Sequence, residues 1–233
     1  MAKPVCVVIG IGPGNGQALA RRFASGGYAL ALLSRRIDLS QSLASELVDA
    51  RAYECDVADA ASVDRAFERI RVELGEVDAL LYNAGSAAWG GVEEISAASF
   101  EADWRVNALG LLLASQAVIP AMKRKGAGSI VVIGATASRR GMPRTASFAP
   151  AKAAQRSLAE SMARQLWPAG IHVSLIIIDG VIDLERTRKR MPDKPDDFFL
   201  KPDDIAATAY WLTEQPRSAW AFEVEARPFG EKW

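Results

Sequence analysis

The chain has 233 residues, half of them hydrophobic and 24% charged, which is enough for one well-packed domain and short for two. Its 28 basic and 28 acidic residues cancel, so no overall field would hold nucleic acid or an anionic membrane surface. We therefore expect a small-molecule substrate that is recognised locally, and neither nucleic acid nor a membrane as a partner.

Short β-branched runs alternate with longer segments of helical period, which is the pattern of repeated βαβ units. The predicted strands are Val5–Ile9, Ala29–Leu33, Ala52–Cys55, Ala79–Tyr82, Ile130–Ile133, Val173–Ile178 and Phe222–Ala226. The predicted helices are Gln17–Ala24, Leu39–Val48, Ser62–Leu74, Phe100–Lys125, Lys152–Leu166 and Ile205–Glu214. Several strands are apolar throughout, as strands covered on both faces must be. The predicted fold class is α/β: a Rossmann-type, doubly wound parallel sheet of about seven strands with helices on both faces, in a single domain over residues 1–233.

The segment from Leu184 to Lys201 differs from the rest of the chain. It is charged, interrupted by prolines, and carries the apolar run Phe198-Phe199-Leu200. This composition predicts a mobile substrate flap with an apolar patch, and no element of the sheet.

The two cysteines, Cys6 and Cys55, fall in predicted strands and match no metal-ligand spacing, so we expect reduced thiols and no metal site. The first four residues lead into a strand without the charged start, apolar run and cleavage site of a secretory signal. The longest apolar stretch, Leu109–Met122, is interrupted by polar residues and a proline and is too short to span a bilayer. A cytoplasmic protein is expected.

A glycine-rich turn, Gly10-Ile11-Gly12-Pro13-Gly14-Asn15-Gly16, follows the first predicted strand and opens the first helix. Such a turn lets a pyrophosphate approach backbone N–H groups and the positive end of the helix. The position of this turn is stronger evidence for dinucleotide binding than its glycines, because it is the first βα turn of an alternating α/β chain. We predict that Gly10, Gly14, Asn15 and Gly16 bind a dinucleotide; a plain tight turn is the alternative.

The second strand should end beside the adenosine ribose, where a carboxylate would bind the 2′-hydroxyl of NAD. The chain has Ser34-Arg35-Arg36 there, and an arginine suits a 2′-phosphate. NADP(H) is therefore favoured over NAD(H), with Ser34 and Arg35 as the binding residues. A solvated basic turn is the alternative, and Asp38 lies close enough in sequence to leave NAD open.

These spacings resemble those of short-chain dehydrogenases/reductases. Gly10, Gly14 and Gly16 stand as in the pattern Thr-Gly-x-x-x-Gly-x-Gly, with Ile9 in place of the threonine. Cys55-Asp56-Val57 resembles the segment whose aspartate binds the adenine, so the resemblance implies cofactor contacts by Asp56 and Val57.

Further motifs of the family follow in order. Tyr82-Asn83-Ala84-Gly85 resembles the Asn-Asn-Ala-Gly motif after the fourth strand, which implies that Asn83, Ala84 and Gly85 border the cofactor. Asn107 falls where the family keeps an active-site asparagine. The resemblance runs from Val5 to about Ile182 and implies a homodimeric or homotetrameric oxidoreductase that uses NAD(P)(H) on a carbonyl or alcohol.

The catalytic segment departs from the family. Phe148-Ala149-Pro150-Ala151-Lys152 resembles Tyr-x-x-x-Lys with phenylalanine for tyrosine, and Ala135 stands where the family has its serine. Reduction of a ketone by hydride leaves an alkoxide, which needs a proton donor and a second group that holds the oxygen. Phenylalanine and alanine supply neither, so ordinary carbonyl reduction should be badly impaired. Lys152 is retained, and in the family it also hydrogen-bonds the nicotinamide ribose.

The nicotinamide end is altered as well. The Pro-Gly turn of the family appears as Asp179-Gly180, and Leu184 stands where a threonine commonly contacts the nicotinamide amide. The resemblance implies cofactor contacts by Gly180 and Ile182. Asp179 ends a strand where such folds place ligands, so it is a speculative replacement proton donor; a turn-forming aspartate is the alternative.

Two functions remain open at this point. The first is an NADP(H)-dependent oxidoreductase with an atypical catalytic site, in which another residue or a bound water completes proton transfer. The second is a catalytically inactive NADP(H)-binding sensor or partner subunit, since a fold alone does not license a function.

Overall fold

The computed structural model describes residues 2–230 and forms a seven-stranded sheet. The strands are β1 (Val5–Ile9), β2 (Ala29–Ser34), β3 (Ala50–Glu54), β4 (Val77–Tyr82), β5 (Gly128–Ile133), β6 (Ile171–Ile178) and β9 (Glu223–Ala226). Their order is β3-β2-β1-β4-β5-β6-β9, and every neighbouring pair is parallel. The order reverses between β1 and β4, so their carboxyl ends form the crevice where open α/β sheets bind ligands. The predicted fold class is confirmed.

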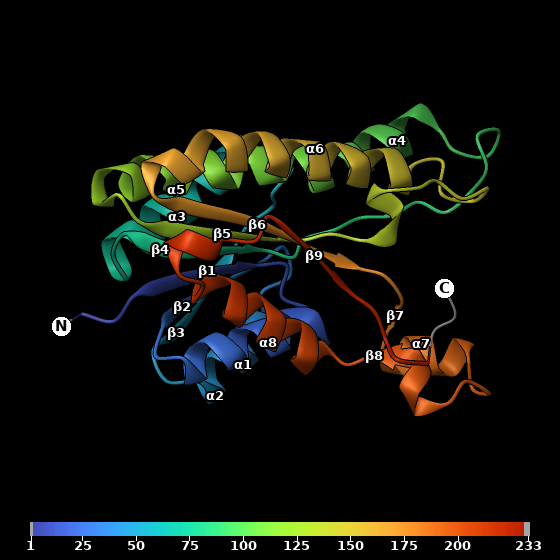
Figure 1. Ribbon diagram of the computed structural model, residues 1–233, viewed down its shortest axis with the longest axis horizontal. Helices are drawn as coiled ribbons and strands as arrows, with labels where there is room; N and C mark the ends of the chain where they lie inside the picture. Colours follow the sequence, from blue (N-terminus) through green and yellow to red (C-terminus); the bar gives the residue numbers. More distant parts are fainter. Residues whose placement is uncertain (1, 231–233) are drawn as a thin grey trace.

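Helices cover both faces of the sheet (Figure 1). One face carries α1 (Asn15–Ser25), α2 (Asp38–Glu46) and α8 (Pro202–Thr213), and the other carries α3 (Ala60–Glu73), α4 (Ala97–Trp104), α5 (Gly110–Lys125) and α6 (Phe148–Leu166). Along β1, Val7 and Ile9 pack toward the α3 and α5 side, whereas Cys6 and Val8 pack toward the α1 side. Because both faces of the strand are buried, the strand is a continuous hydrophobic run.

The predicted helix Phe100–Lys125 is longer and less regular than its sequence suggests. It begins at Ala97, because the side chain of Ser96 accepts a hydrogen bond from the backbone N–H of Ser99 and caps the first turn. A π-helical turn, Arg105–Leu109, joins α4 to α5. Such turns are rare and are frequently found at functional sites.

By length and composition this continuous 29-residue helix could cross a membrane. The sequence expectation of no membrane span rested on the apolar stretch Leu109–Met122 alone, whereas the whole helix Ala97–Lys125 is long enough to cross a bilayer. Half of its most apolar window is buried inside the protein, as in the core helix of a water-soluble protein, because the helix lies on the sheet beside α3 and α6.

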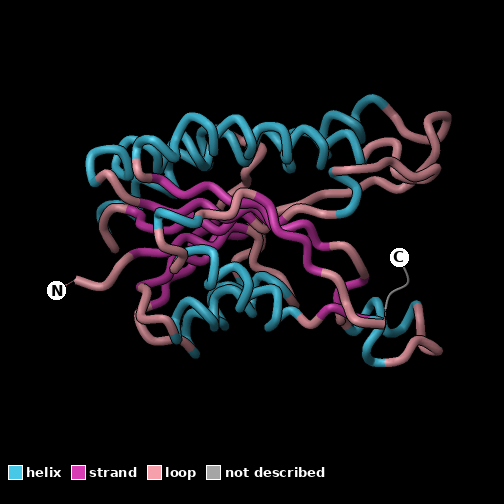
Figure 2. Tube along the Cα trace, viewed as in Figure 1, coloured by secondary structure: helices cyan, strands magenta, loops and turns pink. Residues whose placement is uncertain are grey.

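The segment 184–201 adds no strand to the main sheet, but it contains more regular structure than a flap was expected to have. It forms α7 (Glu185–Arg190), a short 3-10 turn and β8 (Phe199–Leu200), which pairs with β7 (Val181–Ile182). Phe199 and Leu200 are only 4% and 7% exposed, so most of the expected apolar patch is buried by this pairing. Figure 2 shows the segment as a separate group of short elements beyond the carboxyl end of the main sheet.

The single histidine lies far from the carboxyl edge of the sheet. His172 is the second residue of β6, is buried, and stacks on Trp220 at 4.7 Å between ring centroids. Its two ring nitrogens contact the backbone carbonyls of Leu212 and Ala221. The residue therefore has a structural role and is not a catalytic base of the site described below.

Candidate active site

The turns after β1 and β4 touch across the point where the strand order reverses. The register places Ile9 opposite Tyr82, so Gly10 and Asn83 are neighbours. Asn83 donates a hydrogen bond from Nδ2 to the carbonyl of Gly10 at 2.8 Å. A Cβ on Gly10 would lie 2.6 Å from the backbone nitrogen of Ala84, and its φ is +92°. Only glycine satisfies both conditions, which explains the first glycine of the turn.

The start of α1 fits a dinucleotide phosphate. The helix begins at Asn15 without a side-chain cap, so its first N–H groups remain available to an anion at the positive helix end. The Oδ1 atom of buried Asn15 has no partner among residues 2–230. A Cβ on Gly16 would lie 2.5 Å from the Gly10 carbonyl oxygen, whereas one on Gly12 would meet nothing within 4 Å. The turn thus packs tightly on its inner side and is open on its outer side.

The adenosine end carries the two exposed arginines expected from the sequence. Arg35 and Arg36 follow β2 on the surface, and within residues 2–230 neither side chain forms an ion pair. The Ser34 hydroxyl donates to the Arg36 carbonyl at 2.7 Å and also contacts Ser40, so it orders this turn.

The predicted adenine segment lies one strand further along the edge. Asp56 accepts a hydrogen bond from the backbone N–H of Ala58 at 3.0 Å. Val57 is buried, and a Cβ on Gly110 would lie 2.9 Å from its side chain. Both residues sit at the carboxyl edge after β3, as the resemblance implies.

The reactive end is organised around Lys152 and Asn107, which the structure brings together. Lys152 is 6% exposed and Asn107 is fully buried. The Nζ atom of Lys152 donates to the Ile133 carbonyl at 3.2 Å and to Gln155 Oε1 at 2.9 Å. Burial lowers the pKa of Lys152 to about 8. A Cβ on Gly85 would lie 3.5 Å from Asn107 Oδ1 and 3.7 Å from Lys152 Nζ, so the exposed backbone of Gly85 borders both groups.

The two substituted positions contribute hydrocarbon at this end. Phe148 is the first residue of α6, and its ring contacts Trp89 at 5.4 Å between centroids. Trp89 is 61% exposed, so it forms an outer wall. Ala135 lies after β5, where its carbonyl accepts from the Ser138 hydroxyl at 2.7 Å. Neither substituted position can donate a proton.

Asp179 is occupied by other partners. It is 4% exposed, and its carboxylate accepts hydrogen bonds from Thr136 and from Arg227. Arg140 lies 3.8 Å away. These contacts favour the structural role of Asp179 over the speculative role of proton donor, because both oxygens act as acceptors and face a guanidinium.

A second buried carboxylate was missed by the sequence analysis. Asp103, on α4, is 2% exposed and accepts hydrogen bonds from the hydroxyls of Ser86 and Ser147, both at 2.6 Å, and from the backbone N–H of Ala88 at 2.7 Å. It therefore ties the loop after β4 to the residue before Phe148. Asp103 precedes Asn107 by four residues on one helix face, a spacing that could have drawn attention to it.

The segment after β7 covers part of the glycine-rich turn. A Cβ on Gly14 would lie 2.3 Å from Leu184 Cδ2 and 3.7 Å from Pro202. Ile182, predicted to contact the cofactor, pairs with Leu200, and Gly180 connects β6 to β7. The leucine side chain thus lies against the glycine that should face the pyrophosphate.

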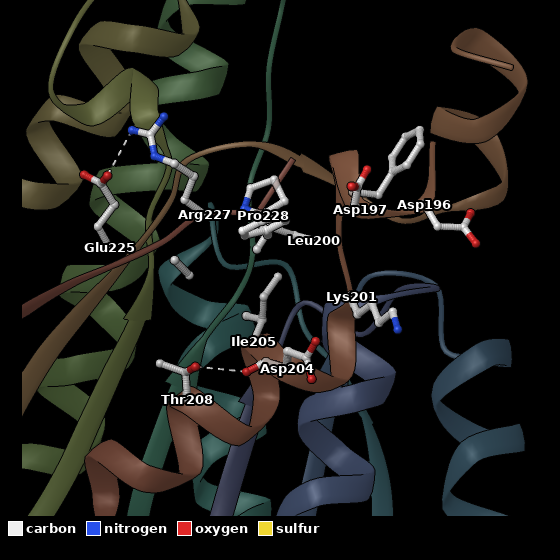
Figure 3. Close-up of a pocket in the computed structure, with 13 residues that line it drawn as sticks. Asp196, Asp197, Leu200, Lys201, Asp204, Ile205, Thr208, Glu225, Arg227 and Pro228 are labelled. Carbon is white, nitrogen blue, oxygen red and sulfur yellow. Dashed lines mark hydrogen bonds and ion pairs between the residues drawn. The ribbon is translucent and has the colours of Figure 1, made fainter. Parts of the chain in front are cut away.

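A cavity of about 600 Å³ lies between the segment 184–201, the start of α8 and the residues after β9 (Figure 3). Asp196, Asp204 and Glu225 supply acidic groups, and Arg227 contributes a guanidinium that also binds Asp179. None of the residues predicted to bind the cofactor or to catalyse a reaction lines this cavity. It is therefore a neighbour of the candidate site and not the site itself.

Residues 4–194 match the family model described as short chain dehydrogenase. The chain belongs to the short-chain dehydrogenase family. It is similar to D-threitol dehydrogenase of Mycolicibacterium smegmatis, with 29% identity over 89% of this chain and 85% of the relative. It is also similar to the 3-oxoacyl-[acyl-carrier-protein] reductase MabA of Mycobacterium tuberculosis, with 31% identity over 80% of this chain and 74% of the relative.

Solved structures of short-chain dehydrogenases share the whole fold. An alcohol dehydrogenase from the archaeon Thermococcus sibiricus, complexed with 5-hydroxy-NADP, superposes with a TM-score of 0.88 and 29% identity over 98% of both chains. A metagenomic short-chain oxidoreductase in complex with NADP gives 0.85 and 25% over 99% of both. Family and fold support an oxidoreductase of this type with a nicotinamide cofactor and a small-molecule substrate.

Proposed function

We propose that the protein is an NADP(H)-dependent short-chain oxidoreductase that acts on a carbonyl or alcohol without the usual tyrosine and serine. The observation that carries this proposal is the buried pair Lys152 and Asn107, which borders the exposed Gly85 at one end of an otherwise intact glycine-rich cradle. Burying a lysine is costly when no opposite charge pairs with it, and the two acceptors of Lys152, the Ile133 carbonyl and Gln155, are uncharged.

Each part of the cradle has a distinct binding task in this proposal. Arg35 faces the 2′-phosphate, the start of α1 binds the pyrophosphate, and Lys152 donates to the nicotinamide ribose. The nicotinamide supplies or accepts the hydride when it is bound. The ammonium of Lys152 lies beside Gly85. Through a bound water it can donate the proton that the alkoxide needs and that Phe148 cannot supply.

The second candidate is a catalytically inactive NADP(H)-binding sensor or partner subunit. The contact between Phe148 and the half-exposed Trp89 favours it, because two aromatic rings stand where a proton donor is needed. Both candidate functions require NADP(H) binding. They differ only in whether the protein converts a substrate. By resemblance to the family we also propose a cytoplasmic homodimer or homotetramer.

Cofactor titration followed by a carbonyl screen tests the proposal. NADPH should bind about ten- to a few-hundred-fold more tightly than NADH, because one or two charge-assisted hydrogen bonds to the 2′-phosphate are gained. Arg35→Ala should remove most of this preference. Equal affinities for the two cofactors in the unmodified protein, or an Arg35→Ala variant that keeps its preference, would refute the assignment of NADP(H). Cofactor binding without turnover of any ketone or alcohol would leave the second candidate.

A further inference from the structure

A glutamine three residues after Lys152 occupies the centre of the reactive end. Gln155 is fully buried on α6. Its Oε1 accepts from Lys152 Nζ at 2.9 Å, and its Nε2 donates to the backbone carbonyl of Asn107 at 3.0 Å. One amide group therefore joins the lysine to the residue that the family keeps as its active-site asparagine.

The π-helical turn is the other half of this arrangement. The carbonyl of Asn107 accepts from Gln155, and the carbonyl of the preceding Val106 accepts from the Tyr82 hydroxyl. The Asn107 side chain is held by its Nδ2 atom, which donates to the carbonyls of Ser86 and Asp103, both at 2.8 Å. Backbone and side chain of Asn107 are thus fixed from two sides.

We propose that Gln155 is a positioning residue that holds Lys152 against the cofactor side of the site, in the absence of a tyrosine. The lysine ammonium has three N–H donors. Two are used by Ile133 and Gln155, which leaves one for a ligand, and Nζ would lie 3.7 Å from a Cβ on the exposed Gly85. Phe148 offers no acceptor that could orient the lysine, so this task falls to the glutamine.

Few other charges act on Lys152. Helix α6 packs against α4, the π-helical turn, the turn after Ala135, and β6. The acidic group that α4 buries is Asp103, which bonds to serine hydroxyls, and Arg105 of the π-helical turn pairs with Glu101. His172 lies at the opposite end of β6 from the site. Burial is the cause of the lowered pKa of Lys152. Gln155 accepts a hydrogen bond from the ammonium and so favours the charged form, which is why removing or charging this acceptor should move the pKa.

The first experiment follows the ionisation of Lys152 without nucleotide. Protein labelled with 13C at the lysine ε-carbon is titrated by NMR, and Lys152→Met identifies the resonance. Gln155→Leu removes an acceptor and should lower the pKa of Lys152 by about one to two pH units, whereas Gln155→Glu should raise it by a similar amount, following the usual strength of a hydrogen bond to a charged group. Gln116→Glu, an exposed change on α5, should move nothing.

The second experiment measures NADPH affinity against pH and rests on the proposed function. Affinity should fall as the lysine loses its proton, near pH 8 in the unmodified protein and at higher pH in Gln155→Glu. Gln155→Leu should bind NADPH about 5- to 30-fold more weakly at pH 7. Circular dichroism on each variant establishes that it is folded.

The two experiments separate two kinds of failure. If the unmodified protein binds no NADPH, the proposed function fails, while the NMR titration still decides whether Gln155 controls the lysine. Lysine titrations that are unchanged in both Gln155 variants overturn the positioning role. A lysine titration that moves while the pH dependence of NADPH affinity stays fixed overturns it too, because the glutamine then acts on a lysine that the cofactor does not use.

Discussion

The phosphate end and the reactive end of this site are built from different parts of the chain. At the phosphate end the backbone forms the site: Gly10 and Gly16 have no room for a side chain, and α1 presents its N–H groups. At the reactive end side chains form the site, and Phe148 and Ala135 stand where the resemblance to the family places its tyrosine and serine. A backbone site cannot be altered without rebuilding the turn, whereas a side-chain site changes with single substitutions. Binding and chemistry can therefore diverge within one fold.

The largest effect should come from restoring both hydroxyls. Ala135→Ser combined with Phe148→Tyr should raise the rate of ketone reduction by up to several orders of magnitude, because a proton donor and an oxygen-holding donor return beside Lys152. Each single variant should recover less than the pair, since both groups act on one oxygen. Steady-state oxidation of NADPH with a panel of ketones measures this. If the wild-type protein already reduces ketones rapidly and the double variant is no faster, the proton donor must be a residue other than the one at position 148.

At the phosphate end, Gly14→Ala should weaken NADPH binding by about 100-fold or more, since a methyl group would project onto Leu184 and into the pyrophosphate path. Gly14 has φ +102°, so part of any effect is backbone strain. Gly75→Ala is the matched control, because Gly75 has φ +108° with nothing near its Cβ and lies before β4. Scanning calorimetry should show that Gly14→Ala loses at least as much stability as Gly75→Ala, and titration calorimetry should show that Gly14→Ala alone loses NADPH affinity. Unchanged NADPH affinity in Gly14→Ala would leave the turn without a role in nucleotide recognition.

The buried Lys152 should lower the free energy of unfolding, whereas the exposed Arg35 should not change it. Burial lowers the pKa of Lys152 from 10.5 to about 8. Between these values the unfolded chain holds a proton that the folded chain has released, so the free energy of unfolding rises with pH in this window. The difference between wild type and Lys152→Met should change across it by about 3 kcal/mol. Urea unfolding at several pH values measures this, with Arg35→Met as the control. A flat difference would show that the lysine is not buried as described.

The smallest effect concerns the leucine that covers the glycine-rich turn. Leu184→Ala should raise NADPH affinity about 3- to 10-fold, because the cofactor no longer has to displace a side chain packed on Gly14. Met191→Ala, at the exposed end of α7, should leave the affinity unchanged. A loss of affinity in Leu184→Ala would instead make this leucine a direct contact of the bound cofactor.

The strands could be predicted from the sequence because their signal is local. β1 has the predicted bounds, and each other strand of the main sheet differs by at most two residues at either end. The start of α6 was placed four residues late, at Lys152, since Pro150 interrupts the helical pattern. The structure puts Pro150 in the first turn of the helix, where proline is tolerated because no N–H bond is required there.

The candidate site could be predicted only in part. Motif spacing predicted Gly10, Asn107 and Lys152 at the carboxyl edge, and they lie there. The contacts of Gln155 with Asn107 and of Arg227 with Asp179 each join residues 48 positions apart, and no local pattern encodes such pairs. The burial of Phe199 likewise depends on β7, whose two-residue strand is too short to be predicted by periodicity.

The separation of binding from chemistry is tested by titrating the wild-type protein and the Ala135→Ser/Phe148→Tyr variant with NADPH in parallel by calorimetry. The two proteins should bind NADPH with affinities that agree within about threefold, because the backbone cradle and Lys152 are the same in both. Absence of saturable binding to the wild type, or binding that emerges only when the two hydroxyls are restored, would contradict the proposal that the nucleotide site is intact while the reacting groups are gone.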